Sequence, residues 1–306
     1  MTHTHTRHLP WKWLAPLMIS TLVAACGGGD PVLGIDGSGT TPFVSVTPVA
    51  PPGGSFVPLG VASTFGAFGG SAGMTNDGPF TVINGDIGTT AVSTAITGFR
   101  NNKPGCTYTV VAGVNEGVVS GNINTAPPPP TGACLSEGTA ATEAIALAAR
   151  ADALVAFNTL AGLPGGVDAG AGNLANLTLA PGIYKAAGGT FMIQGGNLTL
   201  DAQGNPNAVW VFQMAQTLTV GGPGAAFPQS VLLTGGAQAR NVYWQVGSAA
   251  TINAGGGGTM EGTIIARTGV SFSTAGNVAI TTLNGRALSL DASVTMVNTV
   301  INVPAP

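Results

Sequence analysis

The sequence contains very little charge. Only 7% of its 306 residues are Asp, Glu, Lys or Arg, and the formal net charge is -3. Disordered chains combine low hydrophobicity with high net charge, whereas 44% of these residues are hydrophobic, so we expect the chain to fold. Binding to nucleic acid requires a basic patch, and the nine Lys and Arg residues are scattered. We therefore expect no nucleic-acid partner.

Histidine occurs only near the N-terminus, in a segment that has the features of an export signal. A basic start is followed by an apolar run over residues 14–25, which is too short to span a bilayer. The run ends in Val-Ala-Ala before Cys26, which resembles the bacterial lipoprotein signal. We expect residues 1–25 to be removed and Cys26 to be lipidated. An ordinary signal peptide cut after Ala24 or Ala25 is the alternative.

Loss of this segment leaves the mature chain without histidine, because His3, His5 and His8 all lie in it. A Ser-His-Asp triad, a histidine base and a histidine-bound metal are therefore excluded. We expect no enzymatic activity, no metal and no cofactor. We expect the mature protein to be an exported monomer. We expect it to be anchored at the outer membrane or cell surface, or released to the medium.

Cysteine is also scarce. After removal of the signal, Cys106 and Cys134 are the two cysteines that remain besides Cys26. Exported proteins meet an oxidising compartment, so we predict that Cys106 and Cys134 form a disulfide. The bridge would contribute roughly 3–4 kcal/mol by restricting the unfolded chain. Two free thiols are the alternative.

The chain divides by composition into a tether and one domain. Residues 26–58 are rich in Gly, Pro, Ser and Thr and predict a flexible tether, followed by a domain over residues 59–306. Residues 100–136 hold both cysteines and a proline run without any period, which indicates a capping insertion. Residues 139–161 lack Gly and Pro and predict one long helix, with Thr139 as its N-terminal cap and Gly162 after its end.

Short alternating runs repeat after this helix. Leu-Thr-Leu at 177–179 and 198–200 is followed by Leu-Thr-Val at 218–220, which gives a period of 20 to 21 residues. Each run is bounded by Gly, Asn or Pro, and none has helical periodicity. This pattern predicts a β-solenoid, in which equivalent strands stack about 4.7–4.9 Å apart.

Alternation along these strands predicts which side chains face outward. With the apolar residues inward, the residues between them form two columns that carry hydroxyl groups. One column contains Thr178, Thr199 and Thr219. The other contains Thr251, Ser271, Ser273, Ser293 and Thr295.

A flat, uncharged array of hydroxyl and methyl groups does not suit a small molecule, because such sites are concave. It favours an extended solid with its own repeat, and ice is the natural candidate. Threonine suits this task because its β-branch restricts χ1 and its methyl and hydroxyl groups can both contact ordered water. An adhesive or structural solenoid that binds glycan or another cell is the alternative. A polysaccharide lyase is disfavoured because the carboxylates are not clustered.

Six segments resemble the microbial ice-binding-like family, which comprises antifreeze proteins of bacteria, fungi and algae. The resemblance covers most of the mature chain, from about residue 59 to residue 303. The segments are LGVASTFGAFGGSAGMTNDGPFTVINGDIGT (59–89), LTLAPGIYK (177–185), LTLDAQGNPNAVWVFQM (198–214), ARNVYWQVGSAATI (239–252), GTIIA (262–266) and NGRAL (284–288).

This resemblance implies a mainly β fold, an irregular right-handed β-helix of triangular section with the long helix alongside and a small cap. It also implies that N-terminal strands pack out of sequence order. In some members a Thr-Ala/Gly-x-Thr/Asn motif marks the ice-binding face. Residues 274–277 match this motif and residues 248–251 are a close variant, which adds Ser248, Thr274 and Asn277 to the candidate residues. The expected partner is the surface of an ice crystal.

Overall fold

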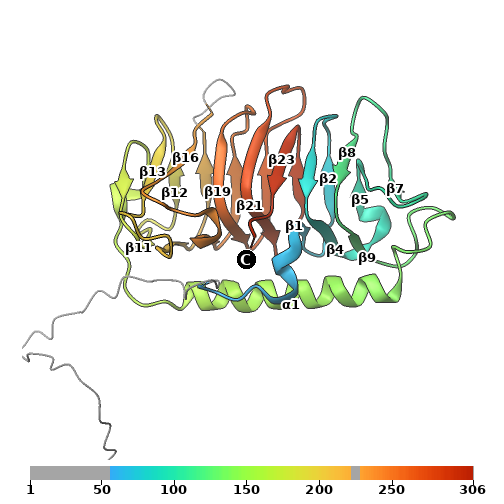
Figure 1. The fold of residues 1–306 in the computed structure, drawn as a ribbon, viewed down its shortest axis with the longest axis horizontal. Helices are drawn as coiled ribbons and strands as arrows, with labels where there is room; N and C mark the ends of the chain where they lie inside the picture. Colours follow the sequence, from blue (N-terminus) through green and yellow to red (C-terminus); the bar gives the residue numbers. More distant parts are fainter. Residues whose placement is uncertain (1–55, 222–227, 306) are drawn as a thin grey trace, which may run out of the picture. The chain divides into compact units, whose positions relative to one another are not determined.

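The computed structural model describes residues 56–221 and 228–305, so the signal segment, Cys26 and most of the tether lie outside the described residues. The described chain winds into a β-solenoid with three faces, and a single long helix runs along one of them (Figure 1). Every strand pair is parallel except the short pair β6 and β7. Parallel stacking of successive coils is the arrangement that the repeats predict.

The first face is a seven-stranded sheet, which we call the ladder face. It contains no helix, and its strands are short, as expected for coils that turn every few residues. In spatial order they are β12 (Phe191–Ile193), β15 (Leu218–Val220), β18 (Ala249–Ile252), β20 (Gly269–Phe272), β22 (Val294–Met296), β2 (Met74–Asn76) and β5 (Ile96–Thr97).

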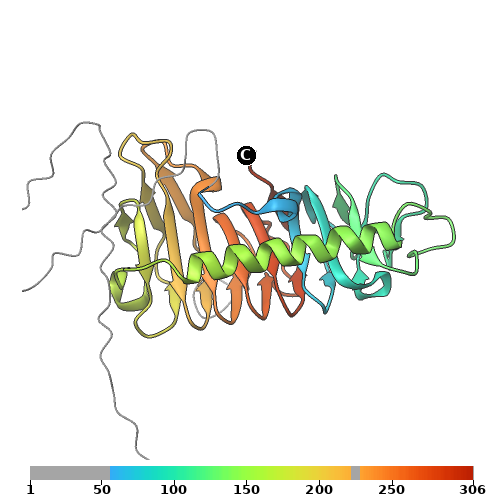
Figure 2. The same ribbon diagram turned by 90° about the horizontal axis from the view of Figure 1, so that it is seen from below.

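The second face, which we call the helix face, lies under the helix α1 (Figure 2). Two of its strands are long and bend around a corner of the solenoid, so only their C-terminal halves belong to this face. The strands are β11 (Gly182–Lys185), β14 (Trp210–Met214), β17 (Val242–Val246), the C-terminal halves of β19 (Thr259–Ala266) and β21 (Thr281–Ser289), then β1 (Phe65–Gly69), β4 (Asp86–Val92) and β9 (Ile123–Ala126).

The third face, which we call the asparagine face, uses the N-terminal halves of β19 and β21. Short 3-10 helices, η1 (Gly60–Thr64), η2 (Ser93–Ala95), η3 (Ala169–Gly172) and η4 (Ala239–Asn241), make connections between the faces. The other strands of the third face are β10 (Thr178–Leu179), β13 (Leu198–Asp201), β16 (Val231–Thr234), β23 (Thr299–Asn302), β3 (Val82–Asn84), β8 (Gly117–Val119), β6 (Phe99–Arg100) and β7 (Thr107–Tyr108).

The N-terminal coil stacks on the C-terminal coil. Strands β1, β2 and β3 pair with β21, β22 and β23, respectively. The expectation that N-terminal strands pack out of sequence order is therefore confirmed. Strands β8 and β9 lie within residues 100–136 and pair with β3 and β4, so this segment is only in part an insertion outside the solenoid.

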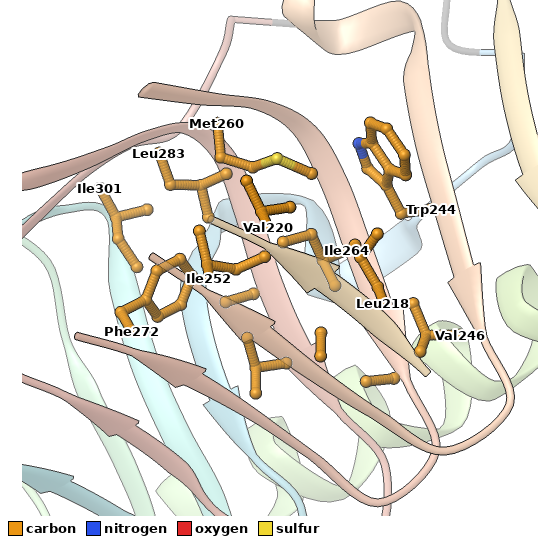
Figure 3. Packing of buried hydrophobic residues seen from close by; sticks show 14 of the residues in the cluster. Leu218, Val220, Trp244, Val246, Ile252, Met260, Ile264, Phe272, Leu283 and Ile301 are labelled. Atoms are coloured by element: carbon orange, nitrogen blue, oxygen red, sulfur yellow. The ribbon is translucent and has the colours of Figure 1, made fainter. Parts of the chain in front are cut away.

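Apolar side chains fill the interior of the solenoid (Figure 3). Trp244 is fully buried and stacks on Phe212 with ring centroids 4.0 Å apart, and its indole N–H donates to the carbonyl of Glu261 at 2.9 Å. Trp210 is also fully buried and donates to the carbonyl of Leu179 at 3.2 Å. Both tryptophans are thus packing residues, and neither presents its ring to solvent for stacking on a sugar.

Helix α1 (Ala140–Ala161) begins and ends where the sequence predicts. Thr139 caps its first turn, because its hydroxyl accepts from the N–H of Thr142 at 3.2 Å while the Thr142 hydroxyl accepts from the N–H of Thr139 at 2.9 Å. Alanines on its inner side allow close packing against the helix face. The buried residues of α1 are Thr142, Ala146, Ala149, Ala153, Ala156, Phe157 and Leu160.

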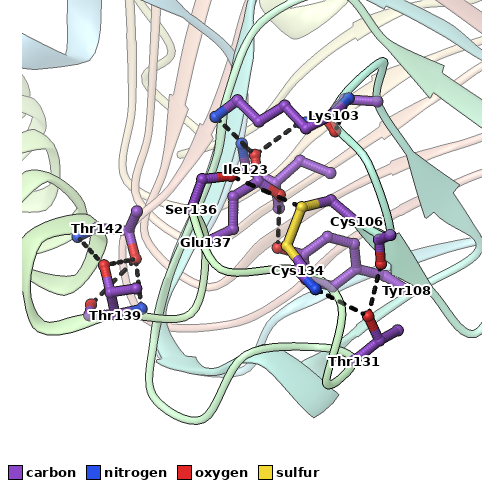
Figure 4. The surroundings of a disulfide bond; sticks show 12 residues. Lys103, Cys106, Tyr108, Ile123, Thr131, Cys134, Ser136, Glu137, Thr139 and Thr142 are labelled. Carbon is purple, nitrogen blue, oxygen red and sulfur yellow. Dashed lines mark hydrogen bonds and ion pairs between the residues drawn. A yellow bond between two sulfur atoms is a disulfide. The ribbon is translucent and has the colours of Figure 1, made fainter.

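A disulfide closes the region at the β9 end of the solenoid (Figure 4). Cys106 and Cys134 are bonded, which confirms the predicted pairing. Beside the disulfide, the fully buried carboxylate of Glu137 accepts from Lys103 Nζ at 3.0 Å and from the Tyr108 hydroxyl at 2.8 Å. Burial, together with the neighbouring Glu137, raises the pKa of Tyr108, so its hydroxyl keeps the proton that it donates.

A ladder of side-chain amides gives the asparagine face its name. Asn84 Nδ2 donates to Asn302 Oδ1 at 2.8 Å, and Asn302 Nδ2 donates to Asn284 Oδ1 at 3.0 Å. Asn284 Nδ2 then donates to Glu261 Oε1 at 2.8 Å, which ends the ladder on a carboxylate. Burial raises the pKa of Glu261, and the hydrogen bond from Asn284 opposes this shift in part.

This raised pKa predicts how stability depends on pH. A carboxyl whose pKa is higher in the folded state favours folding when protonated, so its contribution is present below the ordinary carboxyl pKa and is lost as pH rises through the raised value. Glu261→Gln should remove this loss, because the glutamine oxygen can still accept from Asn284. Chemical denaturation at acidic and neutral pH should show a flatter profile for Glu261→Gln than for the wild type. An identical pH profile in the two proteins would refute the prediction.

Candidate functional site

A continuous column of hydroxyl side chains crosses the ladder face. The strand registers align Thr219 with Thr251, Thr251 with Ser271, and Ser271 with Thr295. They then continue the column onto the N-terminal strands of the face. Its six members, in spatial order, are Thr219, Thr251, Ser271, Thr295, Thr75 and Thr97.

Hydrogen bonds between adjacent rungs and buried residues next to each rung along its strand hold the column in place. Thr295 Oγ1 donates to Ser271 Oγ at 3.0 Å, and Thr97 Oγ1 donates to Thr75 Oγ1 at 3.3 Å. Inward residues that flank each rung, such as Val270 and Phe272 beside Ser271, are fully buried in the core. Thr75 and Thr295 are exposed and the other rungs are half-buried, so the column forms a flat surface with little freedom to rearrange.

Further hydroxyl groups lie beside this column. Thr190 Oγ1 and Thr217 Oγ1 are 3.4 Å apart, and Ser248 Oγ and Thr268 Oγ1 are also 3.4 Å apart. Ser293, which precedes β22, is half-buried at the edge of the sheet. These side chains widen the polar surface without adding charge.

The strands of the ladder face carry no Asp, Glu, Lys or Arg. At the margin of the face, Arg267 Nε lies 2.9 Å from Asp291 Oδ2, so the Arg267 guanidinium forms an ion pair there. Asp291 Oδ1 also accepts from Arg150 on α1 at 2.6 Å. The ladder strands therefore offer hydroxyl and methyl groups in a regular array and no charged side chain.

One predicted member of the array does not reach the surface. Ser273 was expected to face outward, but it is buried, with 7% of its surface exposed. Strand β20 ends at Phe272, and Ser273 has a φ of 58°, so the alternation of side chains stops one residue earlier than the pattern predicts. The prediction that Ser273 faces outward is wrong.

Residues 274–277, which match the family motif, lie beyond the end of strand β20. Thr274 Oγ1 donates to the carbonyl of Ala254 at 2.7 Å, and Asn277 Nδ2 donates to the same carbonyl at 3.0 Å. Asn277 Nδ2 also lies 2.8 Å from Thr274 Oγ1. Thr274 and Asn277 therefore stabilise the corner loop between β20 and β21 and stand outside the hydroxyl column.

The residues of the predicted column Thr178, Thr199 and Thr219 are divided between two faces. Thr178 aligns with Thr199 on the asparagine face, but the next rung there is Leu232, so the hydroxyl column ends after two residues. Thr219 instead aligns with Thr251 on the ladder face. The prediction that Thr178, Thr199 and Thr219 form one column is wrong, because Thr199 on β13 and Thr219 on β15 lie on different faces of the same coil. The residue that stacks below Thr219 is Met192, and the residue that stacks above Thr199 is Leu232.

Sequence reasoning missed Thr75 and Thr97. Each lies next to a buried apolar residue, Met74 or Ile96, which is the same local signal that identified Thr251. Their place in the column depends on the pairing of β2 with β22 and β5, and this pairing joins residues more than 200 positions apart in one case. Alternation alone could have marked them as outward-facing but could not have placed them in the column.

Fold and site together define a parallel β-solenoid with an exposed, uncharged hydroxyl face. A family model described as ice-binding-like matches residues 68–302. The chain is 35% identical over 238 residues to an ice-binding protein of Nostoc sp. (strain HG1), covering 78% of this chain and 71% of that protein. It is also 35% identical over 257 residues to an ice-binding protein of Leucosporidium sp. (strain AY30), with 82% and 85% covered. The chain therefore belongs to the ice-binding-like family.

Solved structures agree with this assignment. An ice-binding protein from the Antarctic ascomycete Antarctomyces psychrotrophicus matches with a TM-score of 0.62 and 32% identity, over 82% of this chain and 99% of that chain. A glycosylated ice-binding protein from an Arctic yeast matches with a TM-score of 0.62 and 30% identity, over 82% and 95%. These relatives are described as ice-binding proteins and not as enzymes.

Proposed function

We propose that this protein adsorbs to ice through the ladder face and thereby inhibits ice growth and recrystallisation. The observation that carries the proposal is the six-rung column from Thr219 to Thr97 on an uncharged, regularly spaced sheet. Family membership supports it, because the relatives described above are ice-binding proteins.

The physical basis is a match between two extended surfaces. Stacked strands repeat about every 4.7–4.9 Å, so one outward side chain per strand forms a regular row. Threonine presents a methyl group and a hydroxyl group from a β-branched side chain with restricted χ1. Because the row is already ordered by the core, binding immobilises few side chains. No chemical step is required, so we propose no catalytic residue, metal or cofactor.

We further propose that the mature protein is exported and that a lipid on Cys26 attaches it to the outer membrane or cell surface. The sequence of the N-terminal segment supports this location, and the tether would separate the folded domain from the anchor. A monomer suffices, because all six rungs come from one chain. Release to the medium is the expected result if the signal is instead cut before an unmodified Cys26.

Adsorption to growing ice tests the proposed function. The mature chain should be enriched in ice grown slowly from solution, whereas an inert soluble protein of similar size in the same sample should be excluded. A glycan array run in parallel tests the adhesive alternative. Binding to glycans together with exclusion from ice would overturn the proposal.

A further inference from the structure

The outward side of α1 is apolar and uncovered. Ile145, Leu147 and Val155 expose 42%, 52% and 63% of their surfaces. Ala146, Ala149 and Ala153 take inward positions of α1, where their small side chains allow the helix to lie close to the sheet. We call the exposed apolar side chains between residues 140 and 155 the outer flank; its members are Ala140, Ala141, Ala144, Ile145, Leu147, Ala151 and Val155. The last turn of the helix instead exposes the polar side chains of Asn158 and Thr159.

The charges of α1 do not make this flank polar. Arg150 Nε donates to the carbonyl of Leu290 at 2.7 Å, and its Nη2 lies 2.6 Å from Asp291 Oδ1. Asp152 Oδ2 accepts from the N–H of Val61 at 2.7 Å. Both side chains are therefore held against the body of the solenoid, while Glu143 is half-buried in the first turn.

A surface helix normally carries charged and polar side chains on the side opposite the core. In α1, 33% of the most apolar stretch is buried within the protein. The outer flank runs from residue 140 to residue 155, which at 1.5 Å per residue gives an apolar strip about 24 Å long. Exposed apolar strips of this kind indicate contact with another protein surface or with a membrane.

The N-terminal segment that leads from Cys26 to Phe56 favours a membrane as the partner of the outer flank. Phe56, the first described residue, packs against the cluster that joins α1 to the helix face, and its ring centroid lies 6.3 Å from that of Tyr243. The 30 residues from 26 to 55 precede it and connect it to Cys26. A chain of 30 residues reaches at most about 100 Å, so a lipid on Cys26 would keep α1 close to the bilayer at a high effective concentration.

We propose that the outer flank of α1 lies on the surface of the lipid bilayer that holds Cys26. This inference rests on the proposed lipid attachment. The flank carries no Lys or Arg, so the contact is apolar and does not depend on anionic headgroups. Since α1 covers the helix face and the ladder face lies on another side of the solenoid, this orientation leaves the ladder face free for ice (Figures 1 and 2).

Quenching by brominated lipid tests the orientation. The mature chain from Cys26, with Val155→Trp, is coupled through the Cys26 thiol to a maleimide phospholipid in phosphatidylcholine vesicles; Cys106 and Cys134 are bonded and do not compete. Trp210 and Trp244 are buried and give a constant background. Brominated phosphatidylcholine should lower the emission of the introduced tryptophan about twofold, because interfacial helices sit ~5–10 Å into the headgroup and acyl boundary.

Leu232→Trp is the matched control, because Leu232 is 44% exposed on the asparagine face. Brominated lipid should not change the tryptophan emission of Leu232→Trp. Adding Leu147→Glu to the Val155→Trp variant should remove the quenching of the tryptophan at position 155. Equal quenching in the two tryptophan variants, whether high or low, would overturn the proposal. A dimer in sedimentation equilibrium that Leu147→Glu dissociates would assign the flank to a second copy instead. Ice adsorption and the mass of the native Cys26 peptide are measured separately, so failure of the proposed function or of lipidation is distinguishable.

Discussion

Replacing Thr251 with tyrosine should weaken adsorption to ice about tenfold without unfolding the protein. Thr251 lies between Thr219 and Ser271 in the column, and a tyrosine ring would project beyond both neighbours. If the ring keeps ~60 Å² of the face from contacting ice, the binding free energy weakens by about 1.5 kcal/mol, at about 25 cal/mol per Å² of buried surface. This loss corresponds to about a tenfold change in the binding constant. The measurement is the protein concentration that gives half-maximal inhibition of ice recrystallisation.

Two matched variants locate the binding face. Thr199→Tyr places the same ring on a half-buried threonine of the asparagine face, and Thr274→Tyr places it on the corner loop. Both should retain most of the wild-type activity, and circular dichroism should show the same β-rich fold in all three variants. Full activity in Thr251→Tyr together with loss of activity in Thr199→Tyr would move the ice-binding surface to the asparagine face.

Glu137→Ala should lower the free energy of unfolding by about 3 kcal/mol or more, because it leaves several buried hydrogen-bond donors without an acceptor at about 1–3 kcal/mol each. Glu137 is fully buried, and its carboxylate accepts from Lys103, Tyr108 and the N–H of Ile123 as well as from Asn101. Alanine would leave these donors without their acceptor in the region of the disulfide. Chemical denaturation of the oxidised protein measures the change.

The control for this variant is Glu116→Ala. Glu116 pairs with Arg100 at 2.9 Å, but both side chains are about one third exposed, so water can replace the lost contact. The expected change is below about 1 kcal/mol. Equal destabilisation by the two substitutions would show that burial of the Glu137 carboxylate is not what stabilises this region.

Local patterns in the sequence predicted the elements of the fold better than their arrangement. The absence of Gly and Pro, with Thr139 before it, located α1, and alternation around Thr251 and Thr295 placed these side chains on the outer surface. Both features depend on neighbouring residues alone. The expected right-handed β-helix with an adjacent helix came from the family resemblance, and the solved structures of relatives support that fold.

The composition of the column depended on contacts that local patterns do not contain. Thr75 joins Thr295 because the N-terminal coil stacks on the C-terminal coil. Ser273 leaves the surface because β20 ends at Phe272 and the backbone then turns. Register between coils and the exact end of a strand are set by packing of the whole solenoid, so a single sequence without its structure does not determine them.

Thermal hysteresis of the folded mature chain is the most direct test of the central claim that this protein binds ice. Purified protein with a β-rich spectrum would be cooled with a single ice crystal under a microscope. The account predicts a gap between melting and freezing temperatures and a faceted crystal within that gap. A folded protein with no gap, unshaped crystals and no inhibition of recrystallisation would contradict the claim and would leave the solenoid with a different ligand.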